Sequence, residues 1–484
     1  MKMLRLAVPY LAIAAAAQSP LSAQAMDLSR APAIGSPPVL RFPTVREDSL
    51  PSGLVLYVVE QHEVPVVQFT LVIQGGARQD GEAAGLATFT ATMLQEGADT
   101  LDAFGVAAQA EYLGAKLSTG ADWDRSYVAV KVPRRTMGRA LQLLATLTLD
   151  PMFRTSEIRR QQSLRFASIR QSADEPDSVA RNAFYAVLYP VGHPYHRPLG
   201  GDSAGTARLD SAVVRHFWLR SYRPSRAQLI VSGDITAVEA KKLVAHAFRN
   251  WHDAADTKHG GNQSVAAPAA GETKVYLVDK PRAAQSVIAI GQTGVERKNP
   301  DYFALQVMNT VLGGSFSSRL NQNLRETKGY TYGAFSGFTY RPVPGPFTAT
   351  AAVRSEVTDS SLIQFFRELR SIRDSMVTDA ELRRAKSYIA LGLPRDLETP
   401  EQLAKAVQTL ILFDLPLDYY EQYVTRIMSV TAEDVQRVAR KYIDPEHLSV
   451  LVVGDEQKIR SGVEALRLGA IEDRGPGGEP RRSQ

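Results

Sequence analysis

Apolar and polar residues follow two spacings along this chain, one typical of strands and one typical of helices. Residues 64–73 are rich in β-branched side chains and predict a strand. Residues 85–96 predict a helix, because Leu86, Phe89 and Met93 recur at helical intervals. A similar period near 3.6 predicts helices over residues 133–149, 155–172, 236–250 and 430–442.

The chain contains two similar halves. The segment LYVVE at 56–60 is matched by VYLVD at 275–279, and LIVSGD at 229–234 is matched by VLVVGD at 450–455. The nearly constant shift of about 220 residues indicates two homologous units. Strands and helices do not alternate regularly enough for a doubly wound parallel sheet. We therefore predict an α+β fold, with a largely antiparallel sheet and helices on one face in each half.

The N-terminus has the pattern of a secretory signal peptide. Lys2 and Arg5 precede an apolar stretch at 6–17, and the small-residue segment SAQA follows at 22–25. We expect cleavage near Ala25 and export to the periplasm, and the apolar stretch is too short to span a bilayer. Gly, Pro and Ser content then predicts the remaining boundaries: an extended arm at 26–46, a first domain at 47–252, a linker at 253–272, a second domain at 273–470 and a disordered tail at 471–484.

Composition excludes several classes of function. The 484 residues carry 56 Lys and Arg against 51 Asp and Glu, a net charge of +5 with no long basic run. A nucleic-acid binder usually has a denser basic surface, so we do not expect nucleic acid as a partner. Cysteine is absent, which excludes disulfides, thiolate metal sites and cysteine nucleophiles.

Short motifs in the first half resemble a known enzyme family. GGARQ at 75–79 precedes the helix that opens with GLA at 85–87, and GADT at 97–100 and GHPYHRP at 192–198 follow. Their order resembles the N-terminal half of the M16 metallopeptidases, and the resemblance extends from about residue 47 to residue 460. It implies two homologous α/β-roll domains, which agrees with the internal repeat.

The zinc motif of that family is missing. Its helix carries His-x-x-Glu-His, in which two histidines bind zinc and the glutamate activates water. Here Thr88 and Thr92 stand at the histidine positions and Ala91 at the glutamate position. The region 166–170, where the third ligand is expected, contains no carboxylate. We therefore expect no metal in this chain; His193 and His196 lie among prolines, where a structural loop is the simpler interpretation.

The second half retains a different family signature. GGSFSSRL at 313–320 and LRETKGYTYG at 324–333 resemble the M16 C-terminal half, in which an Arg and a Tyr seven residues apart reach the active site. The resemblance assigns Arg325 and Tyr332 a role in trans at a partner's zinc site, where such donors stabilise negative charge on the substrate carbonyl. Substrate binding is expected near the segment Gly313, Gly314 and Ser315. The local alternative is that Arg325 pairs with its neighbouring glutamate and Tyr332 packs on a strand.

These observations predict the non-zinc subunit of a periplasmic heteromeric M16-type peptidase. Its partners would be a zinc-bearing M16 paralogue and a peptide substrate, with zinc held by the paralogue and no membrane span after signal cleavage. The alternative is a non-enzymatic peptide-binding or assembly protein on the same scaffold. We do not expect the chain to be catalytic alone, because the zinc ligands of a self-sufficient metallopeptidase are missing.

Overall fold

The computed structural model describes residues 41–253 and 271–481. The predicted signal peptide, most of the predicted arm and most of the predicted linker lie outside these residues, so these predictions stay untested. Within the described ranges, no helix combines the length and the apolar composition needed to cross a membrane.

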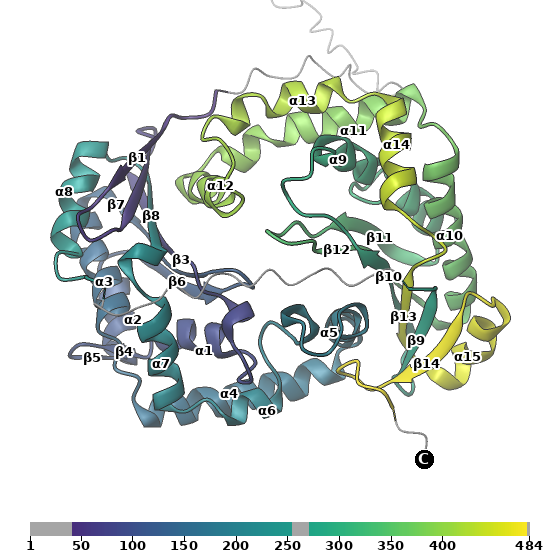
Figure 1. The fold of residues 1–484 in the computed structure, drawn as a ribbon, viewed down its shortest axis with the longest axis horizontal. Helices are drawn as coiled ribbons and strands as arrows, with labels where there is room; N and C mark the ends of the chain where they lie inside the picture. Colours follow the sequence, from purple (N-terminus) through teal and green to yellow (C-terminus); the bar gives the residue numbers. More distant parts are fainter. Residues whose placement is uncertain (1–40, 254–270, 482–484) are drawn as a thin grey trace, which may run out of the picture. The chain divides into compact units, whose positions relative to one another are not determined.

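The first half is built on a six-stranded sheet with the order β1-β2-β8-β3-β7-β6 (Figure 1). Only β2 and β8 pair in parallel, and the other neighbours are antiparallel. Strand β6 lies at one edge. The strands are β1 (Val45–Ser49), β2 (Val55–Glu60), β3 (Val66–Ile73), β6 (Lys116–Ala121), β7 (Ser126–Pro133) and β8 (Ala227–Gly233), and a separate two-stranded ribbon is formed by β4 (Gly97–Ala98) and β5 (Leu101–Asp102).

Helices of the first half cover this sheet and extend beyond it. The predicted helix at 85–96 is confirmed as α1, which begins after Gly85, where φ is 88° and glycine meets no steric penalty. Helix α3 packs its apolar stripe on β7. The helices are α1 (Leu86–Met93), α2 (Ala103–Tyr112), α3 (Met137–Leu149), α4 (Thr155–Asp174), α5 (Pro176–Leu188), α6 (Ser203–Ala207), α7 (Ser211–Ser221) and α8 (Ala237–Ala247).

The second half repeats the first. Its six-stranded sheet has the order β11-β12-β10-β13-β9-β14, and the repeated segments form the parallel neighbours β9 and β13, as their counterparts form β2 and β8. The internal repeat is thus confirmed by strand order. The strands are β9 (Lys274–Asp279), β10 (Gln285–Thr293), β11 (Thr331–Phe338), β12 (Pro346–Arg354), β13 (Ser449–Gly454) and β14 (Ala470–Arg474). The helices are α9 (Tyr302–Leu312), α10 (Thr358–Asp374), α11 (Asp379–Gly392), α12 (Pro400–Leu412), α13 (Tyr423–Ser429), α14 (Ala432–Tyr442) and α15 (Glu456–Ala465).

The two halves exchange a helix. Helix α5 of the first half packs on β10 and β13 of the second sheet, and α12 of the second half packs on β3 and β8 of the first sheet. The α+β class is confirmed, but the prediction of helices on one face was incomplete. Nearly every residue of β3 is buried, because α12 covers the face that the first half's own helices leave open.

The prediction of a disordered tail at 471–484 was wrong for most of its length. Residues 470–474 form β14, which adds to the sheet in parallel beside β9. Ile471 packs against the core of the second half, and the guanidinium of Arg474 lies 5.0 Å from the ring centroid of Tyr276. The Gly and Pro residues that suggested disorder begin only at Gly475, after the strand has ended.

Candidate functional site

Helix α1 presents the three positions at which the zinc motif was expected. The Thr88 hydroxyl donates to the carbonyl oxygen of Gly85 at 2.9 Å, and the Thr92 hydroxyl donates to the carbonyl oxygen of Thr88 at 3.0 Å. Ala91 is fully buried in the first half. Both hydroxyl protons are therefore engaged by the helix backbone, a common arrangement for threonine inside helices.

An arginine from α4 faces these positions. Arg165 Nη1 donates to the Gly85 carbonyl at 2.8 Å, and its Nη2 donates to the Thr88 hydroxyl oxygen at 3.2 Å. Its guanidinium carbon also lies 5.0 Å from the ring centroid of Phe89. Burial lowers the pKa of Arg165 to about 10, with the charge of Asp80 opposing this change. The side chain nevertheless remains a cation at neutral pH.

The start of α1 rests on a buried carboxyl group. Asp80 accepts hydrogen bonds from the backbone N–H groups of Gly85 at 2.7 Å and Ala87 at 2.8 Å, which have no partner inside the helix. Burial raises the pKa of Asp80 to about 7, although these backbone donors and Arg165 act in the opposite direction. Asp80 thus holds the N-terminal end of α1 in place, and its pKa lies near neutrality.

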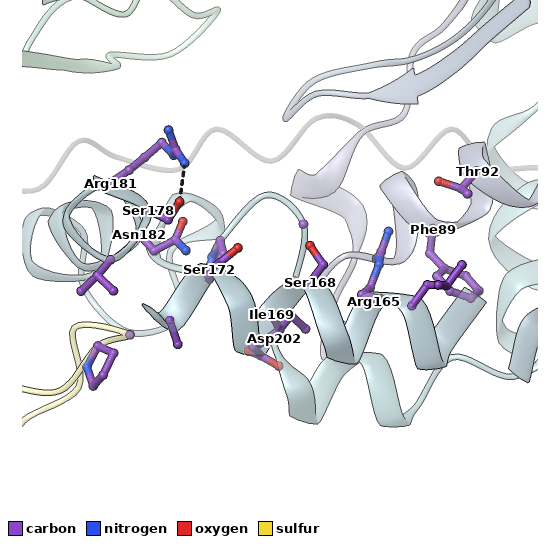
Figure 2. A pocket seen from close by; sticks show the side chains of 18 of the residues that line it. Phe89, Thr92, Arg165, Ser168, Ile169, Ser172, Ser178, Arg181, Asn182 and Asp202 are labelled. Carbon is purple, nitrogen blue, oxygen red and sulfur yellow. Dashed lines mark hydrogen bonds between the residues drawn. The ribbon is translucent and has the colours of Figure 1, made fainter. Parts of the chain in front are cut away.

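A pocket of about 560 Å³ opens beside α1 (Figure 2). Its walls come from α1, α4, α5, the loop at 198–202 and the turn at 476–477. Arg165 and Arg181 both line it. Sequence reasoning examined this region for a missing carboxylate and did not consider Arg165, because a single arginine on a helix gives no signal of its partners.

The second candidate site lies around Arg325 and Tyr332. Arg325 belongs to a π-helix, Asn321–Thr327, and Tyr332 lies where the pairing of β11 with β12 shifts register between Thr331 and Ala334. π-Helical turns and β-bulges both redirect side chains and are frequent at functional sites. Arg325 stacks on Phe316, with its guanidinium carbon 4.3 Å from the ring centroid, and Tyr332 is 90% exposed.

Asn321 connects these two irregular segments. Its side chain is buried, its Oδ1 accepts from the Ala334 backbone N–H at 3.0 Å, and its Nδ2 donates to the Ser315 carbonyl at 3.2 Å. One amide therefore joins the π-helix, the bulged strand and the loop that precedes them. Sequence reasoning missed Asn321, because nothing in a single sequence distinguishes this asparagine from a polar surface residue.

The predicted substrate-binding segment is packed closely against its own chain. A Cβ atom on Gly313 would approach the backbone nitrogen of Ser336 to 2.5 Å, and one on Gly314 would approach Asn309 Nδ2 to 2.7 Å. Ser315 is buried and donates to the carbonyl of Thr310 at 3.1 Å. This packing accounts for both glycines, and a role in binding substrate stays a prediction.

Sequence comparison covers most of the chain. Residues 56–201 match the model described as Insulinase (Peptidase family M16), and residues 208–389 match the one described as Peptidase M16 inactive domain. The chain belongs to the M16 peptidase family. An uncharacterized zinc protease of Mycobacterium bovis is 25% identical over 428 residues, covering 87% of this chain and 96% of the relative. One from Bacillus subtilis is 22% identical over 379 residues, covering 78% and 90%.

Solved structures share the M16 fold. A peptidase M16 inactive domain from Pseudomonas fluorescens superposes with a TM-score of 0.79 at 24% identity, covering 85% of this chain and 98% of that one. A protease from Helicobacter pylori gives a TM-score of 0.80 at 18% identity, covering 85% and 99%. At these identities the likeness extends to the fold alone.

The residues of this M16 chain do not fit the zinc of the family. Two threonine hydroxyls and an alanine methyl replace nitrogen ligands and a general base, and the Arg165 guanidinium brings a positive charge to Thr88. Across residues 41–253 and 271–481, no three His, Asp or Glu side chains gather as a metal site would require. No catalytic step through zinc can therefore be assigned to this chain.

Proposed function

We propose that this chain is the non-zinc subunit of a heteromeric M16 peptidase in the periplasm. It forms part of a chamber for peptides and supplies Arg325 and Tyr332 to the zinc site of a partner subunit. Zinc and the water-activating glutamate belong to the partner, whereas this chain contributes hydrogen-bond donors. A phenol or guanidinium aimed at the substrate carbonyl stabilises the charge that develops there during peptide hydrolysis.

The exposure of Tyr332 is the observation that carries this proposal. A tyrosine that is 90% exposed does not pack on its strand, so the local alternative does not describe this side chain. Phe316 and Phe335 are 61% and 58% exposed, so the surface around Arg325 and Tyr332 is aromatic. Exposed aromatic groups of this kind favour contact with another molecule.

Arg325 is also available to a partner. Its Nε lies 3.5 Å from a carboxylate oxygen of Glu326, and both side chains are about a third to a half exposed. The pair predicted by the local alternative therefore forms, but a solvent-exposed pair of this kind contributes little and exchanges readily. Stacking on Phe316 leaves the guanidinium edge free to donate.

Reconstitution with the zinc-bearing paralogue tests the proposal. The isolated chain should contain no stoichiometric zinc and should cleave no peptide, and mixing it with the paralogue should restore cleavage. Arg325→Ala or Tyr332→Phe should then lower kcat by about 100- to 1000-fold, the usual effect of removing one transition-state donor. Wild-type rates for both variants in the reconstituted complex would contradict the proposal.

Matched controls are available on α11. Arg383 and Tyr388 are exposed side chains of the same types on this helix, and neither belongs to the signature segment. Arg383→Ala and Tyr388→Phe should leave the reconstituted rate unchanged. Export is tested separately, by cell fractionation of the full chain and of a chain lacking residues 2–25.

The second candidate function is peptide binding without catalysis. The pocket between α1, α4 and α5 supports it, because this cavity lies beside the helix that lacks the zinc motif. Under this function, the chain would bind peptides alone, and the Arg325 and Tyr332 variants would leave every measured cleavage rate unchanged.

A further inference from the structure

The pocket beside α1 has the dimensions and the walls of a ligand site. Its volume of about 560 Å³ lies within the range of small-molecule and peptide pockets. Apolar walls come from Phe89, Leu164, Ile169 and Val179. Polar groups line the rest: Ser168, Ser172, Ser178 and Asn182. This combination suits a peptide, whose backbone needs hydrogen bonds and whose side chains need apolar contact.

The charge of the lining is positive. Arg165 and Arg181 line the pocket together with a single carboxylate, Asp202. That carboxylate is already engaged, because its Oδ1 accepts from the Gly205 backbone N–H at 2.6 Å at the start of α6. The two guanidinium groups therefore give the lining a net positive charge, although Asp80, which lies outside the lining, acts on Arg165 through its charge.

Arg165 is held in place by neutral groups. Its two hydrogen bonds go to the Gly85 carbonyl and the Thr88 hydroxyl, and its guanidinium lies against the ring of Phe89. Within the described residues, Arg165 forms no ion pair with a carboxylate, and Asp80 acts on it only through its charge. A partly buried guanidinium with unused N–H groups is a strong site for a carboxylate, which can accept two hydrogen bonds from it.

Arg181 provides a second, more exposed donor. It is exposed, and its Nη2 donates to the Ser178 hydroxyl oxygen at 3.2 Å. Figure 2 shows Arg165 near α1 and Arg181 on α5, with Ser168 and Ser172 between them along α4. Arg165, Ser168 and Ser172 follow one another at helical spacing, so they share one face of α4.

We propose that this pocket binds the carboxylate of a peptide, either the C-terminal carboxylate or the side chain of an aspartate or glutamate. Arg165 receives the carboxylate, Arg181 adds positive charge at the other end of the pocket, and the serine and asparagine side chains bond the peptide backbone. The inference rests on the proposed function in so far as the chain holds peptides. The inference adds a preference for acidic peptides. It assigns this preference to the pocket beside α1, the helix that binds zinc in the M16 family.

Peptide binding to the isolated mature chain tests this inference. Three rhodamine-labelled heptapeptides of Ala and Ser are compared by fluorescence anisotropy: one with a free C-terminal carboxylate, one with a C-terminal amide, and one amide with a central Asp. At least one acidic peptide should bind about 10- to 100-fold more tightly than the neutral amide, as charge-assisted hydrogen bonds predict. The tighter of the two acidic peptides identifies the source of the carboxylate.

Variants decide whether the preference arises in this pocket. Arg165→Gln should remove the preference for acid over amide, and Arg181→Gln should reduce it. Arg170→Gln changes an exposed arginine of the same helix that does not line the pocket, and it should keep the preference. If Arg165→Gln lowers the helical circular dichroism, its effect on binding could reflect a loss of folded protein. The Arg181→Gln variant then tests the inference, because Arg181 is exposed and its substitution should leave the fold intact.

Two results would overturn the inference: equal affinity for acidic and neutral peptides, or an unchanged preference in both pocket variants. Neither result touches cleavage by the reconstituted complex, because no partner is present in the binding assay. Conversely, if the reconstituted complex cleaves no peptide but the isolated chain still prefers acidic peptides, the proposed catalytic role would be wrong and the inferred peptide site would still be supported.

Discussion

Arg165 Nη2 donates a hydrogen bond to Oγ1 of Thr88 across 3.2 Å, and this contact joins α4 to the helix that carries zinc ligands in M16 peptidases. A guanidinium is always charged near neutral pH and has no acceptor for a metal. The lost motif is thus accompanied by a cation that would repel a divalent ion. The absence of the histidines and the presence of Arg165 therefore act in the same direction.

Restoring the two histidines should therefore fail to restore zinc binding. Thr88→His/Thr92→His places two imidazoles at i and i+4 but leaves Arg165 beside them, and we expect no stoichiometric zinc after dialysis. Adding Arg165→Glu replaces the cation with a carboxylate that can act as a third ligand, and zinc affinity should rise by at least about 100-fold. Elemental analysis and calorimetric titration measure both steps. Tight zinc binding by the double variant would show that Arg165 does not oppose the metal.

Asp80 should make stability depend on pH. Its pKa is raised from 3.8 to about 7 by burial, so the folded state keeps a proton that the unfolded state has released between these values. The free energy of unfolding should therefore fall as pH rises from about 4 to 7, by up to about 1.4 kcal/mol per pH unit from this group. Above pH 7 and below pH 4 the contribution should be flat.

Denaturant unfolding of the wild type and Asp80→Asn across pH 4 to 8 measures this contribution. The variant is always neutral and should lack this part of the slope, although it loses one of the two bonds to the start of α1. If the free energy of unfolding changes with pH by the same amount in the wild type and in Asp80→Asn, the pH dependence arises from other groups.

Asn321 should act as a positioning residue for Tyr332. Asn321→Ala leaves the Ala334 N–H without its acceptor and frees the bulge in which Tyr332 lies. We expect kcat of the reconstituted complex to fall roughly 10-fold with little change in KM, since an unmade buried hydrogen bond costs about 1–3 kcal/mol. Combining Asn321→Ala with Tyr332→Phe should add little, because both act through one side chain. Independent, multiplying effects would show that Asn321 does not act through Tyr332.

The sequence predicted local features well, because they depend on residue spacing. The period of Leu86, Phe89 and Met93 located α1, and the repeated segments indicated two homologous halves, whose sheets share one strand arrangement. The resemblance to the M16 family placed Thr88, Ala91 and Thr92 at the motif positions, and their residue types led to the prediction that this helix cannot bind zinc.

Long-range pairing could not be predicted in the same way. An amphipathic pattern says that one face of a helix is buried but not which sheet covers it, so the exchange of α5 and α12 was not foreseen. Strand β14 depends on its pairing with β9, and Arg165 depends on its contact with α1. Each of these features joins residues far apart in sequence, and single-sequence patterns contain no information about such contacts.

The exchanged helices should keep the two halves together after the chain is cut. Ser232 Oγ of β8 donates to the Pro400 carbonyl at the start of α12 at 2.6 Å, and Arg341 of the second half lies 4.2 Å from the ring centroid of Tyr195 in the first. The apolar face of α5 is likewise buried on the second sheet. Each half alone would expose one face of its sheet and one apolar helix.

Fragments ending at residue 253 and beginning at residue 271 test this dependence. Expressed together, they should copurify as a one-to-one complex with the circular dichroism of the intact chain, whereas each expressed alone should aggregate. Leu403→Asp in the second fragment buries a charge between α12 and the first sheet, and it should prevent copurification. The matched change Lys405→Asp on the exposed side of α12 should not. Two soluble, independently folded fragments would show that the exchanged helices are dispensable for either half.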